Sequence, residues 1–162
     1  MDDTLLTRRA WMARVTTAAM GGAMLTVLSP ATSEASGAPT PITVYKDPSC
    51  GCCTKWVAHL RANGFAPQPH DRSDMDALKD SLGVPPALRS CHTATVGAYV
   101  IEGHVPAADI ARLVSTKPAK TLGLAVPGMP TGSPGMEMGN RTDRFDVVAF
   151  DARGATRVFS RH

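Results

Sequence analysis

The sequence predicts a single α/β domain in which helices cover both faces of a central mixed β-sheet, extended by a loop rich in methionine, glycine and proline and by a C-terminal β-hairpin. Two observations predict this class. Segments with the alternating pattern of strands are interleaved with segments whose apolar residues recur at helical spacing. Residues 36–162 also have the length of one ordinary domain, so we expect no second core.

The first strand is predicted at residues 42–46, which are rich in β-branched and aromatic side chains. A helix is predicted at residues 52–63, because Asn63 and Gly64 are typical of a helix C-terminus. The apolar positions of this helix are about one turn apart, at Cys53, at Trp56 or Val57, and at Leu60. Cys53 is therefore expected at the top of the inward face.

The second strand, at residues 65–70, contains two prolines that cannot donate to a ladder, so we expect it to be short or to lie at an edge. Ser73 and Asp76 have the spacing of a capping box, which predicts a helix that starts there and ends at Gly83. One side of this helix carries Met75, Leu78 and Leu82.

After Cys91 the pattern predicts two strands, at residues 93–96 and 99–102, joined by a tight turn at residues 97–98. Pro106 then opens a helix, since proline is favoured at the first helical position. The apolar face of this helix consists of Ile110, Leu113 and Val114.

The order strand, helix, strand, helix, hairpin, helix is a thioredoxin-like order, with three layers and a Cys-x-x-Cys at the start of the first helix. Residues 127–139 contain too much proline and glycine for a helix or strand, so they predict a loop that carries methionines. A last hairpin is predicted at residues 146–150 and 155–160.

The first 35 residues have the pattern of an export signal. Arg8 and Arg9 precede an apolar stretch at residues 15–28, which is shorter than the about twenty residues that span a bilayer. Small residues at 33–35 offer a cleavage site. We interpret residues 1–35 as a twin-arginine-type signal peptide and residues 36–162 as a periplasmic domain without a membrane segment. The alternative is an N-terminal anchor that is retained.

The charge pattern argues against nucleic acid as a partner. The formal net charge is +3, the two signs are interspersed, and aromatic residues make up 5% of the chain. Nucleic-acid binding proteins usually gather basic and aromatic side chains on one surface. The sequence contains no such run.

Three of the four cysteines, Cys50, Cys52 and Cys53, fall within four residues at the predicted strand-to-helix turn. In a continuous helix Cys50 and Cys52 would point about 200° apart. If the helix begins near Cys52 and Gly51 supplies a permissive turn, the three sulfurs can gather at the helix N-terminus, where thiolates are favoured. In a thioredoxin-like order the loop that holds Cys91 faces the same place, so Cys91 is the natural fourth sulfur.

An oxidising compartment also allows these cysteines to form disulfides. The least strained pairing joins Cys50 to Cys53 and Cys52 to Cys91. A purely structural framework would more naturally spread its half-cystines over separate loops. The clustering therefore favours redox or metal chemistry, and it leaves both open.

The donor types favour a soft metal. A site of three or four thiolates suits zinc, Cu(I) or an iron-sulfur cluster. Structural zinc usually uses two separated Cys-x-x-Cys pairs, and the common ferredoxin spacings are absent, although an exported folded protein can carry a preloaded cofactor. Thioethers select Cu(I), and the predicted loop carries Met129, Met136 and Met138. The alternative for these methionines is that they cover nearby apolar surface.

Two histidines are candidates for the same site. His92 adjoins Cys91, so it is a candidate ligand or a partner of one. His104 lies at a strand-to-helix junction, where it can bind metal or hydrogen-bond to the helix end. His59, His70 and His162 receive no role, and Glu137 is expected to order the loop.

Four segments together, at residues 45–53, 90–93, 99–106 and 128–138, resemble the CopG-type copper-resistance proteins, a periplasmic thioredoxin-like family first catalogued as a domain of unknown function. The resemblance covers nearly all of residues 41–161. It implies copper binding by the cysteine cluster and a role in copper tolerance, often beside other periplasmic copper-handling proteins.

We therefore predict a copper-resistance protein that binds Cu(I) through Cys50, Cys52, Cys53 and Cys91, with His92, Met136 and Met138 as auxiliary ligands. Four clustered sulfurs can bridge, so a polynuclear copper-thiolate centre is an alternative to a mononuclear one. The centre is also a candidate for interconverting Cu(I) and Cu(II). The competing hypothesis is a periplasmic thiol-disulfide oxidoreductase in which Cys50 and Cys53 are catalytic. A copper chaperone would use the same ligands and would need a docking surface as well.

Overall fold

The computed structural model describes residues 37–162, so the predicted signal peptide at residues 1–35 lies outside the described residues. The strands of this part are β1 Thr40–Lys46, β2 Phe65–Asp71, β3 His92–Val96, β4 Tyr99–Glu102, β5 Gly123–Ala125, β6 Asp146–Phe150 and β7 Thr156–Arg161. The helices are α1 Gly51–Ala62, α2 Met75–Ser81, the 3₁₀ turn η1 Pro86–Leu88, and α3 Ala107–Thr116. Within residues 37–162 no helix has both the length and the apolar character needed to cross a bilayer.

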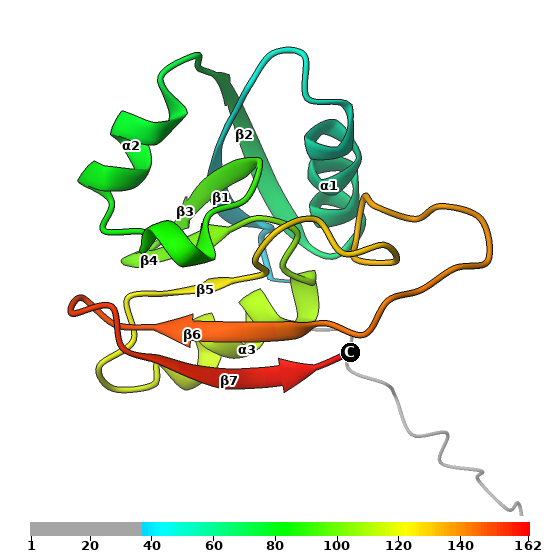
Figure 1. Ribbon diagram of the computed structural model, residues 1–162. Coiled ribbons are helices and arrows are strands. Elements are labelled where there is room, and N and C mark those ends of the chain that lie inside the picture. Colours follow the sequence, from blue (N-terminus) through cyan, green and yellow to red (C-terminus); the bar gives the residue numbers. More distant parts are fainter. Residues whose placement is uncertain (1–36) are drawn as a thin grey trace, which may run out of the picture. The chain divides into compact units, whose positions relative to one another are not determined.

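All these strands belong to one mixed sheet in the order β2-β1-β3-β4-β5-β6-β7 (Figure 1). The pairs β1–β2 and β4–β5 are parallel, and the other neighbours are antiparallel. The fold is therefore the predicted thioredoxin-like α/β fold, and β6 and β7 form the predicted C-terminal hairpin. Because β1 and β3 are neighbours, the loops at their ends can approach each other.

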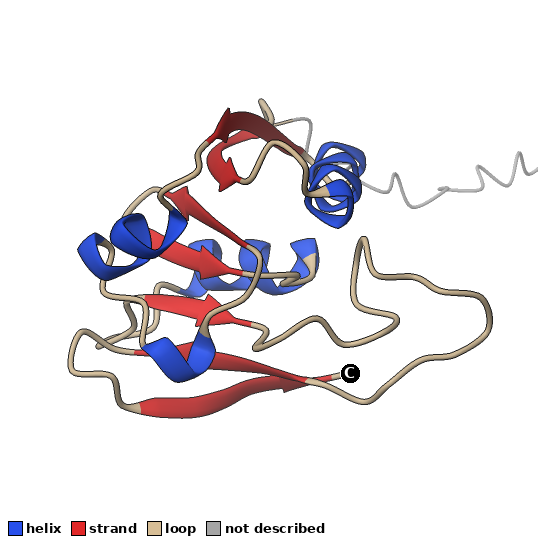
Figure 2. Cartoon of the chain, turned by 45° about the horizontal axis from the view of Figure 1, so that its top comes forward, coloured by secondary structure: helices blue, strands red, loops and turns tan. Residues whose placement is uncertain are grey.

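The sheet separates two apolar clusters, which makes the domain three-layered (Figure 2). Helices α1 and α3 cover one face, and η1 with the end of α2 covers the other. The larger cluster includes Ile42, Val44, Trp56, Leu60, Ile101, Ile110, Leu113 and Leu124. The smaller one consists mainly of Val84, Leu88, Val100, Ala125 and Phe150. The buried side of α1 includes Cys53, as its spacing predicts.

Two local predictions need correction. The capping box at Ser73 is wrong, because α2 starts after Asp74, whose carboxylate is engaged by the Arg72 side chain (Nε to Oδ1, 2.7 Å) and caps no amide. Strand β5 is absent from the prediction because its three residues are too few to display a period. It fits there because Gly123 lacks a side chain: a Cβ would lie 2.0 Å from the Val100 carbonyl oxygen. By contrast, among the strands of residues 37–162 β2 pairs with β1 alone, so its prediction as an edge strand is confirmed.

His59 joins α1 to α3. Its Nε2 accepts a hydrogen bond from the Ala107 amide at 3.1 Å, which satisfies one of the N–H groups that a helix N-terminus leaves without a partner. Accepting this bond requires a neutral imidazole. Partial burial lowers the pKa of His59, against a smaller opposing effect of the Glu137 carboxylate.

We expect acid to weaken the fold partly through His59. The folded pKa is below the ordinary value of 6.5, so this contribution to stability is complete above that pH and is lost as the pH falls toward the folded pKa. His59→Gln keeps an acceptor but cannot titrate. Its free energy of unfolding in urea should therefore fall less steeply between about pH 7 and pH 5 than that of the parent protein. His70→Gln, which makes the same replacement at an exposed position, is the control.

Candidate metal centre

The turn between β1 and α1 holds Cys50 outside the helix. The Cys50 amide donates to the Asp47 carbonyl at 3.0 Å, and Cys50 itself is the extended N-cap residue of α1. This geometry places Cys50 close to Cys53 in the first turn of α1. The two residues form a disulfide, and their Cα atoms are 5.4 Å apart. The predicted special turn at Gly51 is wrong, because Gly51 is simply the first helical residue and its φ is not positive.

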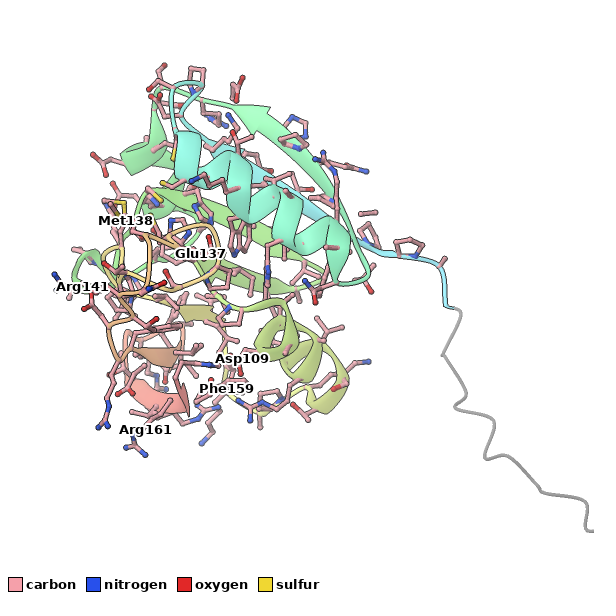
Figure 3. The ribbon with its side chains drawn as sticks, turned by 90° about the vertical axis from the view of Figure 1, so that its right-hand side faces the viewer. Asp109, Glu137, Met138, Arg141, Phe159 and Arg161 are labelled. Atoms are coloured by element: carbon pink, nitrogen blue, oxygen red, sulfur yellow. A yellow bond between two sulfur atoms is a disulfide. The ribbon has the colours of Figure 1, made fainter. Side chains whose placement is uncertain are left out.

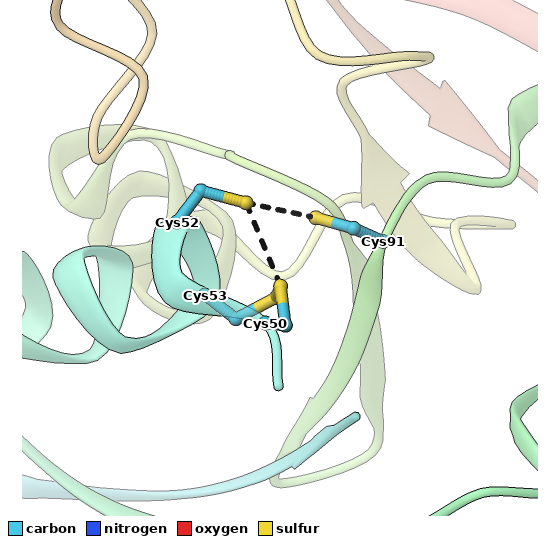
Figure 4. A group of neighbouring side chains, drawn as sticks. All are labelled: Cys50, Cys52, Cys53 and Cys91. Atoms are coloured by element: carbon cyan, nitrogen blue, oxygen red, sulfur yellow. Dashed lines mark hydrogen bonds between the residues drawn. A yellow bond between two sulfur atoms is a disulfide. The ribbon is translucent and has the colours of Figure 1, made fainter. Parts of the chain in front are cut away.

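The four cysteine sulfurs lie within 4.8 Å of one another (Figure 4). Cys52 Sγ lies 3.5 Å from Cys50 Sγ and 3.9 Å from Cys91 Sγ. Cys52 and Cys91 are free thiols. Cys52 is thus the sulfur that connects the disulfide to the distant cysteine.

Cys91 also contacts two imidazoles. Its Sγ lies 3.3 Å from His92 Nδ1 and 3.1 Å from His104 Nε2. His104 Nδ1 lies 2.8 Å from the Pro134 carbonyl oxygen, to which it can only donate. The neutral His104 ring therefore presents the Nε2 lone pair to Cys91, as metal-binding histidines do when their other nitrogen is held.

The predicted ligand set omitted His104, although the hairpin register could have found it. Thr93 pairs with Glu102 in the β3–β4 ladder. Continued for two more residues, the same antiparallel register sets Cys91 opposite His104. The position of Cys91 in the sequence therefore points to His104 as soon as the turn at residues 97–98 is recognised.

Burial controls the charge of these groups. Burial, reinforced by the neighbouring Cys52 sulfur, raises the pKa of Cys91 to about 12. In the disulfide form Cys91 is therefore a neutral thiol at pH 7, because its half-buried sulfur lies outside the helix N-terminus. Burial likewise lowers the pKa values of His92 and His104, so both rings are neutral at pH 7. Neutral imidazole is the form that binds metals.

One buried polar atom at this site has no hydrogen-bond partner. His92 is fully buried, and its Nε2 is the orphan among the buried side-chain nitrogens and oxygens of residues 37–162. The ring packs against Trp56 at 4.3 Å between centroids. Leaving such an atom unpaired costs about 1–3 kcal/mol. The nitrogen of this ring that faces the Cys91 sulfur is the other one, Nδ1.

The methionine-bearing loop, residues 127–139, leaves the sheet after β5 and returns to α1 (Figure 1). There Gly135 lies against the backbone of Cys52 and Trp56. Met136 is half-buried, whereas Met129 and Met138 are 53% and 64% exposed. Glu137, shown beside Met138 in Figure 3, accepts a hydrogen bond from the Gly135 amide at 2.9 Å, in keeping with its expected loop-ordering role. The loop thus lies against the cysteine-bearing turn, with two of its methionines facing solvent.

We expect Gly135→Ala to lift this loop off α1. Gly135 has φ +87°, and a Cβ there would lie 2.8 Å from the Trp56 amide nitrogen and 2.9 Å from the Cys52 carbonyl oxygen. Backbone strain and displacement should lower the free energy of unfolding by about 1–3 kcal/mol and speed proteolysis of the loop. Gly139→Ala is the matched control, since Gly139 also has a positive φ but a Cβ at that position would have no atom within 4 Å. Equal effects of the two variants would contradict this contact.

Comparison with known proteins gives three findings. The family model described as "Protein of unknown function, DUF411" matches residues 88–136, a span that includes Cys91, His104 and Met136. Two solved structures, titled "Copper resistance protein copG", Form 1 and Form 2, each share 48% sequence identity with the chain and superpose with a TM-score of 0.73. Each alignment covers 76% of this chain and 98% of the other. No curated protein matches the chain.

Proposed function

This chain belongs to the CopG family of copper resistance proteins, and from that premise we propose that it binds copper in the periplasm as part of copper resistance. The metal is bound as Cu(I) by the thiolates of Cys50, Cys52, Cys53 and Cys91. The signal peptide proposed at residues 1–35 supports the location. The copper is cargo or substrate of the protein rather than a structural part of it.

The observation that carries this proposal is the convergence of soft donors. Four sulfurs from two separate segments lie within 4.8 Å of one another, and His104 Nε2 lies 3.1 Å from one of them. Thiolates and imidazoles are the donors that Cu(I) prefers. Structural disulfides do not require a third and fourth cysteine at such short range.

The site offers several soft donors close together. Because thiolate sulfurs can bridge metal ions, the four clustered sulfurs can hold a polynuclear copper-thiolate centre as well as a single Cu(I) ion. We add His104 to the ligands expected from the sequence, because its lone pair faces Cys91. His92 is proposed as an auxiliary ligand because its Nδ1 lies 3.3 Å from Cys91 Sγ. Met136 and Met138 remain proposed auxiliary ligands, carried by the loop that packs on the Cys52 turn.

The disulfide also suggests a redox role. Reduced Cys50 and Cys53 can give two electrons to two Cu(II) ions, forming two Cu(I) ions, the disulfide and two released protons. The Cys50–Cys53 bond equally favours a second candidate function, that of a thiol-disulfide oxidoreductase acting on protein thiols. The two functions differ in their need for Cys52, because a Cys-x-x-Cys couple uses only its two outer cysteines.

Titration with Cu(I) against a coloured chelator tests the proposal. Anaerobic, fully reduced protein should bind more copper than protein that retains the Cys50–Cys53 disulfide, since the disulfide removes two of four sulfurs. Metal analysis of protein purified anaerobically from copper-supplemented cells should find copper. Zinc alone in that protein, or equal copper binding by the reduced and disulfide forms, would count against the proposed site.

Copper affinity should increase with pH. Because burial raises the pKa of Cys91 to about 12, binding at neutral pH must displace the Cys91 proton. The apparent affinity should therefore rise about tenfold per pH unit for each proton released. Competition titrations of the disulfide form at pH 6 and pH 8 measure this slope. Cys91→Ser should remove the part of the slope due to Cys91, and an unchanged slope would exclude Cys91 as a ligand.

A further inference from the structure

A buried charged network lies directly beneath the Cys91 loop. Glu102, at the end of β4, is fully buried, and Lys79 of α2 is 3% exposed. Glu102 Oε1 accepts hydrogen bonds from Lys79 Nζ at 2.5 Å and from the Ser90 amide at 2.6 Å. Glu102 Oε2 accepts from Thr93 Oγ1 at 2.7 Å, and Lys79 Nζ also donates to Thr93 Oγ1 at 2.8 Å.

The residues that contact this carboxylate flank Cys91 and His92. Ser90 precedes the pair and Thr93 follows it, so a single side chain holds both ends of the segment. Two further bonds support the same segment: the Ser90 hydroxyl donates to the Gly128 carbonyl, and the Gly103 amide donates to the His92 carbonyl at 2.9 Å. The hydrogen bonds of Glu102 thus connect this carboxylate to the residues on both sides of Cys91 and His92.

Stability alone does not account for the network. Replacing a buried ion pair with well-packed apolar side chains is often neutral or stabilising, because desolvating two charges offsets their attraction. The half-buried Ser90 amide, in contrast, lies between η1 and β3, outside any helix or ladder, so its acceptor at this point comes from a side chain. A carboxylate supplies that acceptor and a second one for Thr93.

We infer that Glu102 is a positioning residue for the Cys91 thiol, which it holds beside Cys52 and His104 through the Ser90 backbone. This inference rests on the proposed function only in taking Cys91 as a metal ligand. The placement of the thiol itself can be tested without copper.

Two neutral double variants separate the hydrogen bond from the charge. Lys79→Met with Glu102→Gln keeps an acceptor for the Ser90 amide, whereas Lys79→Met with Glu102→Leu removes it. In metal-free protein, diamide oxidises Cys52 and Cys91 to a disulfide: the two thiols lose two electrons and two protons, and the diazene N=N bond of diamide takes them up as a hydrazine. Peptide mass spectrometry measures the rate of this cross-link.

The Leu variant should cross-link more slowly and bind Cu(I) about 10–100-fold more weakly than the parent protein, as expected when the partner of a ligand is lost. The Gln variant should restore most of both properties. Equal cross-linking by the two variants overturns the positioning role. If the variants differ in cross-linking but the parent protein binds no copper, the positioning role stands and the proposed function fails.

A measurement on the parent protein keeps the inference testable even if the Leu variant does not fold. The Ser90 amide should exchange with solvent deuterium as slowly as the amides of β3. Exchange at the rate of exposed loop amides, such as that of Ala98, would overturn the inference, because Glu102 would then not hold the Ser90 backbone.

Discussion

Replacing Cys52 with serine is expected to abolish stoichiometric copper binding while the Cys50–Cys53 disulfide still forms. Cys52 Sγ is the atom that links the other sulfurs, at 3.5 Å from Cys50 Sγ and 3.9 Å from Cys91 Sγ. A hydroxyl is a poor ligand for Cu(I), so the substitution removes the bridge between the two segments. The disulfide partners bond directly to each other and do not require Cys52.

Copper per protein after anaerobic purification, together with the rate of insulin disulfide reduction, measures this outcome. Thr54→Ser is the control, because Thr54 is exposed on the same helical turn and serine keeps the hydroxyl that donates to the Cys50 carbonyl. It should keep both properties. Full copper content in Cys52→Ser, with loss of disulfide reductase activity, would reverse the order of the two proposed functions.

Lys79→Met is expected to cause a large loss of stability, about 3–5 kcal/mol in the free energy of unfolding near pH 7. The substitution removes the cation that is hydrogen-bonded to the buried Glu102 carboxylate, although Ser90 and Thr93 still donate to it. Burial raises the pKa of Glu102, and Lys79 opposes that rise. Without Lys79 the folded-state pKa therefore rises further.

A carboxyl group whose folded pKa exceeds its unfolded value of 4.5 favours the folded state at low pH, and that contribution is lost as the pH rises through the folded pKa. Urea unfolding should thus show a smaller deficit for Lys79→Met at about pH 5 than at about pH 7.5. Adding Glu102→Gln should recover most of the lost stability. A deficit independent of pH, and not relieved by that second change, would contradict a charge effect.

Local patterns in the sequence predict most of the fold. Alternation and helical spacing locate α1, α3 and the two hairpins, since each depends on residues near one another in the chain. Strand β5 escapes prediction because three buried residues display no period, and its position is set by pairing with β4 and β6, which are remote in sequence. The capping box is misplaced by one residue, because α2 begins after Asp74 rather than after Ser73.

Sequence patterns likewise predict one part of the candidate site, and the other part required the structure. The run from Cys50 to Cys53 indicates soft-donor or redox chemistry by itself, because its density exceeds any structural need. That His104 faces Cys91 required the β3–β4 register, and that the loop touches α1 required the absence of a side chain at Gly135.

The sequence by itself determined the strand-turn-helix that carries the cysteines, the distant Cys91 and the methionine-bearing loop, because residue type and local spacing specify these features. Only the tertiary structure decided how the donors meet and what charge they carry. The high pKa of Cys91, the neutral state of His92 and the buried Lys79–Glu102 pair all depend on desolvation by residues remote in sequence. Burial is a property of the whole packed domain, and no local pattern contains it.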